Sequence, residues 1–242
     1  MAGYNAHQFG KNPARDGVLR YPPAWMFVKI CGITNEDDAL LAVALGADAV
    51  GFVFAPSVRQ IAVKQAYDIA RRLPPEILTV GVFRDSAPDW VVRQMSDAGL
   101  KAAQLHGNET PAVTREVRRH IGYVIQAFPA GSPAAERAGE FGADVILIDS
   151  ATPGSGTMFD WSLVDQAPLG AKILLAGGLT PDNVAIAIAR VKPWGVDVST
   201  GVEREPGRKD PVKLKEFIEA ARAAAPIPYR GPDEMPYDWA DE

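Results

Sequence analysis

The stretch "ALGADAVGFVF" (44–54) joins the end of a helical pattern, through a glycine, to a run of small, apolar and aromatic residues. The stretch "EFGADVILIDS" (140–150) has the same order and begins 96 residues further along, which is four units of 24. A continuous apolar run after a helix is typical of a strand buried in a parallel sheet. The repeat therefore indicates a fold of regular helix–strand units, in which the sixth strand echoes the second.

Eight apolar runs alternate with amphipathic stretches along the chain. They are residues 27–31, 49–54, 78–83, 102–106, 123–128, 144–149, 172–177 and 195–200. This order predicts a closed (β/α)8 barrel, also called a TIM barrel, as a single domain over residues 26–224. The alternative is an open doubly wound sheet, but that fold usually carries a Gly-x-Gly-x-x-Gly turn after its first strand, and "CGITNE" is not one. Residues 1–25 are polar and residues 225–242 are proline-rich and acidic, so we expect both to be tails.

The composition argues against several classes of partner. The formal net charge is −5, and the one basic cluster lies at helical spacing, as a solvated helix face does, so we expect no nucleic-acid partner. That cluster consists of Arg115, Arg118, Arg119 and His120. The apolar runs are too short to cross a membrane and the N-terminus lacks the apolar core of a signal peptide, so we expect a cytoplasmic protein. A single cysteine excludes an internal disulfide, and three histidines without ligand spacing predict no metal site.

Two glycine-bearing turns follow the seventh and eighth predicted strands. In "LLAGGLTPDNV" (174–184), Gly177 and Gly178 let the backbone approach a ligand, and Thr180 is a good N-cap for the next helix. In "DVSTGVEREPG" (197–207), a glycine is placed to open a short extra helix. Turns of this kind in these two units form the common phosphate site of such barrels. The predicted ligand-binding residues of the two turns are Gly177, Gly178, Thr200 and Gly201.

The only cysteine, Cys31, closes the first predicted strand. Side chains alternate along a strand, so Cys31 and Lys29 share one face, and both point into the barrel if Ile30 packs against the helices. Cys31 would then lie at the catalytic rim, but free cysteines are also common as small buried apolar residues, and position alone leaves both interpretations open. Lys29 needs a partner, because an unpaired buried charge is very costly. Asp197, on the adjacent eighth strand, is the candidate for a structural ion pair.

Two further polar residues lie at strand ends. Alternation puts Asp149 at the rim end of the sixth strand, across the barrel mouth from Cys31, where a carboxyl and a thiol can act as an acid–base pair. An acid at this place can also be a loop cap. Arg59 follows the second strand, where its guanidinium can hold a carboxylate by two parallel hydrogen bonds or can lie on the surface.

Several motifs together resemble the phosphoribosylanthranilate isomerase family of tryptophan biosynthesis. They are "KICGIT" (29–34), "GFVFAPSVR" (51–59), "QLHG" (104–107), "IDSATPGSGTMFDW" (148–161), "LAGGLTPDNV" (175–184) and "VDVSTGVE…PGRKD" (196–210). The family converts N-(5-phosphoribosyl)anthranilate into 1-(2-carboxyphenylamino)-1-deoxyribulose 5-phosphate, an Amadori rearrangement that uses no cofactor. The resemblance implies this small-molecule substrate, and a monomer or homodimer as the assembly.

The resemblance also implies a role for each candidate residue. Carried over by position, Cys31 is the general base, Asp149 the general acid and Arg59 the residue that binds the anthranilate carboxylate, while the two glycine turns bind the phosphate. The acid must hold a proton near neutral pH, and the base must be a thiolate. A helix that begins near Thr34, with Asp37 completing a capping box, would lower the pKa of the thiol.

The chain departs from the family pattern in the loop after the predicted acid. This loop reads "PGSG" where the family tends to "GGTG", so Pro153 and Ser155 are expected to change how the loop closes. Two alternatives stay open. One is a related aminoaldose-phosphate isomerase of histidine biosynthesis, against which Cys31 argues because that chemistry is expected to use two carboxylates. The other is a non-catalytic barrel that binds a phosphorylated ligand.

Overall fold

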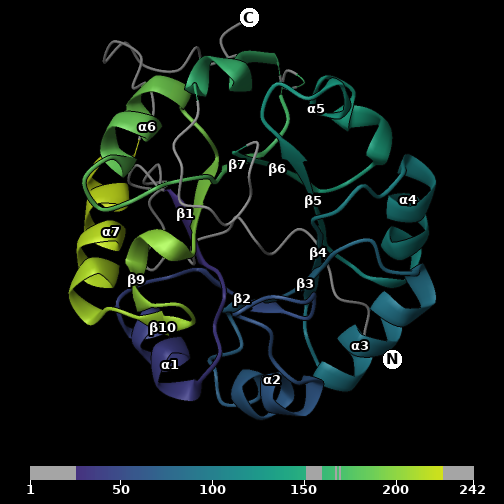
Figure 1. The fold of residues 1–242 in the computed structure, drawn as a ribbon, viewed down its shortest axis with the longest axis horizontal. Coiled ribbons are helices and arrows are strands. Elements are labelled where there is room, and N and C mark those ends of the chain that lie inside the picture. Colours follow the sequence, from purple (N-terminus) through teal and green to yellow (C-terminus); the bar gives the residue numbers. More distant parts are fainter. Residues whose placement is uncertain (1–25, 151–159, 167, 169, 226–242) are drawn as a thin grey trace, which may run out of the picture.

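The strands close into a barrel in the order of the chain. The computed structural model describes residues 26–150, 160–166, 168 and 170–225. Each strand is parallel to its neighbours, and the last pairs with the first (Figure 1). The strands are β1 (Phe27–Ile30), β2 (Ala49–Val53), β3 (Leu78–Phe83), β4 (Ala102–Leu105), β5 (Val124–Pro129), β6 (Val145–Asp149), β7 (Ile173–Leu175) and β8 (Gly195–Val198). The predicted barrel is confirmed, and the open doubly wound sheet is wrong.

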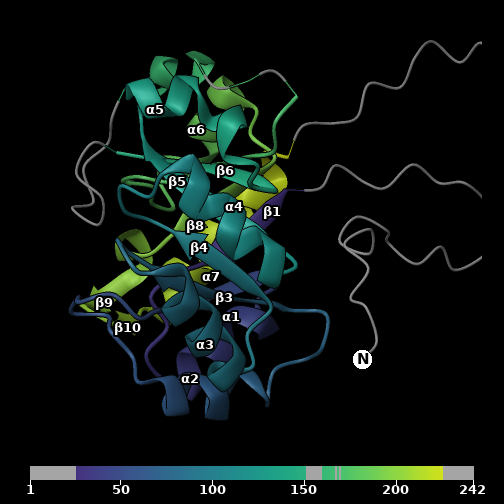
Figure 2. The ribbon, with the colours of Figure 1, turned by 90° about the vertical axis from the view of Figure 1, so that its right-hand side faces the viewer.

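Helices surround the barrel (Figures 1 and 2). The α-helices are α1 (Glu36–Ala44), α2 (Val63–Ala70), α3 (Pro88–Ala98), α4 (Pro111–His120), α5 (Pro133–Glu136), α6 (Val184–Val191) and α7 (Pro211–Ala223). The 3-10 helices are η2 (Ala138–Phe141), η3 (Trp161–Gln166) and η4 (Thr200–Val202), and a hairpin of β9 (Glu203–Glu205) and β10 (Arg208–Lys209) follows η4. In the part of the chain that the structure describes, none of the helices has the length and apolar character that a membrane span requires.

The predicted tails and the loop after β6 fall largely outside the described residues. This applies to residues 1–25, 151–159 and 226–242, and so to the expected effect of the "PGSG" loop. Ala225, two residues after the end of α7, is buried in the core. The boundary of the C-terminal tail stays a prediction.

Side-chain alternation divides the core into two layers. One apolar cluster contains residues of the helices and therefore lies between strands and helices, whereas the other contains residues of the strands and their flanks and fills the barrel interior. On β1, Phe27 belongs to the inner cluster and Val28 and Ile30 to the outer one, so Lys29 points inward as predicted. On β6 the inward series ends at Asp149. The predicted inward residues thus reach the carboxyl ends of their strands.

The start of α1 differs from the sequence prediction. Its N-cap is Asn35, whose Oδ1 accepts a hydrogen bond from the backbone N–H of Asp38 at 2.9 Å. The hydroxyl of Thr34 instead donates to the carbonyl oxygen of Gly207 at 2.6 Å. The Thr34–Asp37 capping box is therefore wrong by one residue, because a contact from the distant hairpin occupies the threonine.

Arg222 ties the last helix to the first two strands. Its guanidinium, on α7, donates to the carbonyl oxygen of Met26, to that of Gly46 at 2.7 Å and to Oδ2 of Asp48 at 2.8 Å. The same carboxylate oxygen accepts the N–H of Val28 at 2.8 Å. These contacts join the last helix of the barrel to the N-terminal ends of its first two strands.

Replacing this arginine should destabilise the fold. We expect Arg222→Met to lower the free energy of unfolding by about 2 kcal/mol, because it removes several hydrogen bonds at once, one of them to a partly buried carboxylate. Urea denaturation measures the change. Arg93→Met, at an exposed position of α3, is the matched control and should change little. Equal losses of stability in Arg222→Met and Arg93→Met would contradict the stabilising role of the Arg222 hydrogen bonds.

Candidate active site

A cavity opens at the C-terminal end of the barrel. Its volume is about 330 Å³, and the ends of β6 and β8 and the loops after β7 and β8 line it. Five of the predicted site residues line this cavity: Asp149, Gly177, Gly178, Thr200 and Gly201. The structure thus brings the predicted acid and both predicted phosphate turns together.

Glycine is required where the two turns meet. A Cβ on Gly201 would lie 1.8 Å from the carbonyl oxygen of Leu179, a distance that no side chain tolerates. Gly177 and Gly178 have φ angles of 85° and 65°, which are left-handed conformations. The cavity wall is therefore made of closely packed backbone here, the kind of surface that binds phosphate through N–H groups.

Asn183 holds the turn after β7, and the sequence analysis missed it. Its Oδ1 accepts the N–H of Thr180 at 2.8 Å, and its Nδ2 donates to the carbonyl oxygen of Gly178 at 2.9 Å. The helix α6 begins only at Val184, with Asn183 in the N-cap position, so the prediction of Thr180 as N-cap is wrong. An asparagine directly before an apolar helical run is a usual start signal and could have placed this boundary.

Asp149 is nearly buried at the cavity wall and has a histidine beside it. Its Oδ1 accepts the N–H of Ser150 at 2.7 Å, and Nε2 of His106 lies 3.3 Å from its Oδ2. Nε2 of Gln104 lies 2.9 Å from Nδ1 of His106. Gln104 therefore contacts one ring nitrogen of His106, and the other ring nitrogen lies near the predicted acid. The sequence analysis gave His106 no role, although it directly follows β4.

Cys31 is buried beside the cavity rather than in its wall. Its N–H donates to the carbonyl oxygen of Val198 at 2.8 Å, and Val198 lines the cavity. Lys29 lies on the same inward face, and its ammonium is 2.9 Å from Oδ1 of Asp197, which confirms the predicted ion pair. Burial raises the pKa of the Cys31 thiol, and the Lys29 ammonium opposes that rise. That the start of α1 acts to lower this pKa stays a prediction.

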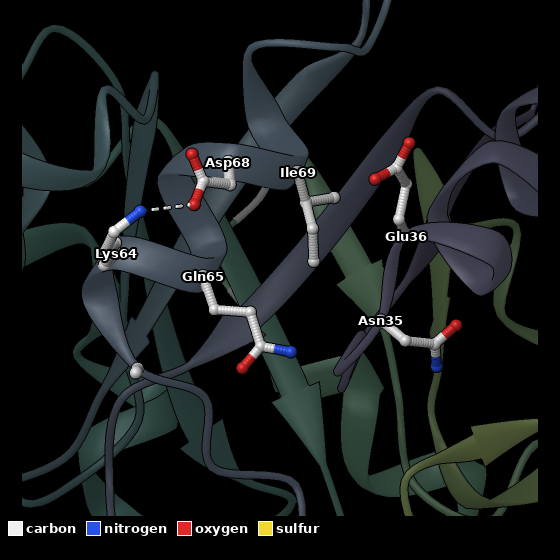
Figure 3. Close-up of a pocket in the computed structure, with 7 residues that line it drawn as sticks. Asn35, Glu36, Lys64, Gln65, Asp68 and Ile69 are labelled. Carbon is white, nitrogen blue, oxygen red and sulfur yellow. Dashed lines mark hydrogen bonds and ion pairs between the residues drawn. The ribbon is translucent and has the colours of Figure 1, made fainter.

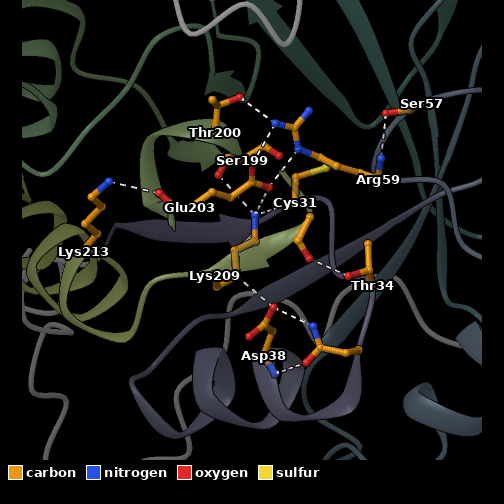
Figure 4. A network of polar contacts seen from close by, with 12 residues as sticks. Cys31, Thr34, Asp38, Ser57, Arg59, Ser199, Thr200, Glu203, Lys209 and Lys213 are labelled. Atoms are coloured by element: carbon orange, nitrogen blue, oxygen red, sulfur yellow. Dashed lines mark hydrogen bonds and ion pairs between the residues drawn. The ribbon is translucent and has the colours of Figure 1, made fainter. Parts of the chain in front are cut away.

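Arg59 is held by a carboxylate of the protein itself (Figure 4). Its Nε and Nη2 each donate to one oxygen of Glu203 at 2.8 Å, and Nη2 also donates to the hydroxyl of Thr200 at 3.1 Å. A two-pronged clamp on a ligand carboxylate, as the sequence suggested, is therefore not available in this arrangement. Among the described residues, Nη1 of Arg59 has no partner, so this nitrogen remains for a ligand.

Lys209 joins this arginine network to the cysteine. Its ammonium is fully buried and donates to Oε1 of Glu203 at 3.1 Å, to the carbonyl oxygen of Cys31 at 2.7 Å and to that of Ser199 at 3.1 Å. Burial acts to raise the pKa of Glu203, but hydrogen bonds from Arg59 and Lys209 outweigh it, and the net shift is downward. Glu203 thus stays ionised and connects the loop after β2 to the hairpin after β8, and Lys209 extends the network to Cys31 at the end of β1. The sequence analysis missed both residues, whose only signal was the charged hairpin "EREPGRKD".

A second hollow lies outside the barrel, between α1 and α2 (Figure 3). Its volume is about 420 Å³, and its polar lining includes Lys64 and Asp68, which form an exposed ion pair at 2.8 Å. None of the predicted site residues lines it. Size alone would favour this hollow, but the chemistry lies at the barrel mouth.

The fold and the barrel mouth together define a class of protein. A (β/α)8 barrel with backbone turns after β7 and β8, an acid on the cavity wall and a thiol beside it is typical of enzymes that act on phosphorylated sugars. Known proteins narrow the class further. The model of the N-(5'-phosphoribosyl)anthranilate (PRA) isomerase family matches residues 28–220.

Individual relatives agree with this match. The N-(5'-phosphoribosyl)anthranilate isomerase of Desulforudis audaxviator is 50% identical over 204 residues, which cover 81% of this chain and 98% of that protein. The crystal structure of phosphoribosyl anthranilate isomerase from Thermus thermophilus is 42% identical, with a TM-score of 0.77 over 81% of this chain and 98% of that one. Another such isomerase was crystallised with reduced 1-(o-carboxyphenylamino)-1-deoxyribulose 5-phosphate and matches with 42% identity and a TM-score of 0.72 over the same shares. The chain belongs to the PRA isomerase family.

The contact between the two turns can be tested at Gly201. We expect Gly201→Ala to raise the KM of the isomerase reaction roughly 10²-fold, because a methyl group would force apart the loops that form the cavity wall. Steady-state kinetics measures this change. Gly122→Ala is the matched control, since a Cβ there meets no atom within 4 Å, and it should leave KM as it is. An unchanged KM in Gly201→Ala would refute the role of the contact.

Proposed function

We propose that the barrel-mouth cavity of this isomerase converts N-(5-phosphoribosyl)anthranilate into 1-(2-carboxyphenylamino)-1-deoxyribulose 5-phosphate, with Asp149 as acid and Cys31 as base. The observation that carries these roles is that Asp149 and both glycine turns line one cavity. The backbone N–H of Cys31 donates a hydrogen bond to the carbonyl oxygen of Val198, which also lines this cavity. The ligand of the solved relative has the chemistry of this product. Family membership favours this reaction over the histidine-pathway isomerase and the non-catalytic barrel.

The first step is ring opening by Asp149. Its carboxyl donates a proton to the ring oxygen of the ribose, the bond from that oxygen to C1 breaks, and the nitrogen lone pair forms a C=N bond. One oxygen of the carboxylate that results accepts the N–H of Ser150, and Nε2 of His106 lies 3.3 Å from the other oxygen. Both groups are in place before the reaction, so little reorganisation is needed as charge develops.

The second step is proton abstraction by Cys31. The thiolate takes the hydrogen of C2 as a proton, the C–H electron pair becomes a C=C bond, and the C=N electrons return to nitrogen. The enolamine then tautomerises to the ketone, with loss of the C2 hydroxyl proton and gain of a proton at C1. A thiol that takes and returns a proton needs no acyl intermediate, and no activating histidine contacts Cys31 among the described residues.

Substrate binding divides between the two ends of the ligand. The backbone turns around Gly178 and Gly201 are placed for the phosphate. Arg59 is placed for the anthranilate carboxylate through Nη1, while Glu203 and Thr200 hold its other nitrogens. The carboxylate contact is thus a single charged hydrogen bond from a preoriented group.

The reacting residues are tested by removing each in turn. Cys31→Ser and Asp149→Asn should each lower kcat by roughly 10²-fold or more, with smaller effects on KM, because each removes a proton-transfer group. A fluorescence assay follows the loss of the anthranilate-linked substrate. Asp97→Asn, an exposed carboxylate of α3, is the control and should turn over normally. Near-normal kcat in Cys31→Ser or Asp149→Asn would overturn the assignment.

The role of Arg59 has a separate kinetic signature. Arg59→Ala should raise KM by roughly tenfold or more and change kcat less, because it removes a charged contact to a part of the substrate that does not react. Competitive inhibition by inorganic phosphate should stay as in the parent, since the phosphate turns remain. If KM does not change, Arg59 is a structural partner of Glu203 only.

Two expectations from the sequence are carried forward as part of this proposal. The enzyme works in the cytoplasm, where its phosphorylated substrate would be made and kept. It is a monomer or a homodimer, and size-exclusion chromatography with light scattering distinguishes the two.

A further inference from the structure

Lys29 is a fully buried cation directly below the proposed base. Its side chain has no exposed surface, and its ammonium contacts Oδ1 of Asp197 at 2.9 Å. The two residues are register partners on β1 and β8, and Asp197 also lines the cavity. Packing alone does not require an ion pair at this place, because the other residues of the inner cluster are apolar.

The geometry around Gly51 brings the ammonium and the thiol together. A Cβ placed on Gly51 would lie 2.8 Å from Sγ of Cys31 and 3.2 Å from Nζ of Lys29. Both atoms therefore lie over the same glycine of the neighbouring strand β2, and no side chain separates them there. Lys29 thus has two neighbours that can be anions, the carboxylate of Asp197 and the sulfur of Cys31.

The charges around Cys31 favour an anion. The charged side chains of the described residues that act on it are Lys29, Asp197, Arg59 and Lys209, and Glu203 contacts the last two of these. These are three cations and two anions, which leaves one positive charge in excess near a single ionisable thiol. A thiolate would neutralise the group.

We propose that Lys29 is a positioning residue whose charge favours the thiolate form of Cys31 against its burial, and that Asp197 limits this effect by sharing the ammonium. The proposal rests on the proposed function in one respect, the use of Cys31 as the base. During turnover the proton moves from carbon to sulfur and back, and Lys29 keeps its own protons throughout. The lysine acts by its charge and not as a proton carrier.

The directions of the pKa shifts agree with this role. Burial acts to lower the pKa of the Lys29 ammonium, but the charge of Asp197 and that of Cys31 outweigh it, and the net shift is upward. Burial raises the pKa of the Cys31 thiol, Lys29 is the largest opposing influence, and Asp197 adds to the rise. The active thiolate is lost as the pH falls through the thiol pKa, so the loss of Lys29 should move the acid limb of kcat/KM to higher pH. The loss of Asp197 should move the thiol pKa the other way.

The experiment uses the full chain, in which Cys31 is the only cysteine. The pH dependence of alkylation by iodoacetamide, and of thiolate ultraviolet absorbance after subtraction of Cys31→Ser, both report this residue alone. The titration is measured in the parent, Lys29→Met, Lys29→Arg and Asp197→Asn, with circular dichroism to confirm folding. Lys64→Met removes an exposed positive charge of α2 and is the control for net charge.

We expect Lys29→Met to raise the titration midpoint by about one unit or more, which is a tenfold loss of thiolate at a pH below the midpoint. Lys29→Arg should restore part of the shift, Asp197→Asn should lower the midpoint, and Lys64→Met should not move it. Shifts of Lys29→Met and Asp197→Asn in the same direction would show general damage and overturn the proposal, as would an unmoved midpoint in folded Lys29→Met. If Lys29→Met does not fold, Lys29→Met/Asp197→Asn is compared with Asp197→Asn, and the lysine substitution should still raise the midpoint.

The titration needs no substrate, so its outcome is separate from that of the proposed function. The predicted shifts in an enzyme that fails to turn over phosphoribosylanthranilate would support the lysine's role and refute the function. Normal turnover of phosphoribosylanthranilate, together with an unmoved thiol midpoint in Lys29→Met, would support the proposed function and refute the lysine's role. In active variants the acid limb of kcat/KM should shift by the same amount as the thiol titration.

Discussion

The ion pair between Lys29 and Asp197 lies at the seam where the first strand meets the last. The two residues are register partners at 2.9 Å, so the pair forms only when β1 and β8 close the barrel in one alignment. A slip of either strand would leave a buried charge without its partner, which is far more costly than the loss of an apolar contact. This alignment brings Cys31, two residues beyond Lys29, level with Ser199, two residues beyond Asp197. The cavity wall and the proposed base therefore depend on one cross-strand contact.

A second charged network joins segments at the rim, as the Lys29–Asp197 pair joins β1 and β8 in the interior. Glu203 accepts hydrogen bonds from Arg59 and Lys209, and Lys209 also donates to the carbonyl oxygen of Cys31. Segments at the ends of β1, β2 and β8 are thus held by one carboxylate together with Lys209. The close approach of Gly201 to Leu179 then joins the last two loops through backbone alone. These contacts hold together the part of the rim where we propose that the phosphate and the carboxylate of the substrate bind.

Much of the site could be predicted because strand ends of a parallel barrel meet at one rim. Asp149 and the glycines of the last two turns were placed by strand order alone, and the structure puts them around one cavity. The partners of these residues were not predictable in the same way. His106 reaches Asp149 from another strand, and Glu203 meets Arg59 across 144 residues of sequence. The two-pronged clamp failed for that reason, since nothing local to Arg59 shows that Glu203 occupies it.

The sequence by itself determined the barrel, the inward faces of β1 and β6 and part of the set of residues at its mouth. These follow from the two-residue period of strands and from the order of strand and helix units. Both patterns can be seen in the linear sequence without knowledge of long-range contacts. Only the tertiary structure decided which charges meet, which helix begins where, and in which direction the pKa of Cys31 shifts. Those outcomes depend on burial and on distances of a few ångströms between residues far apart in the chain, and closure of the barrel sets both.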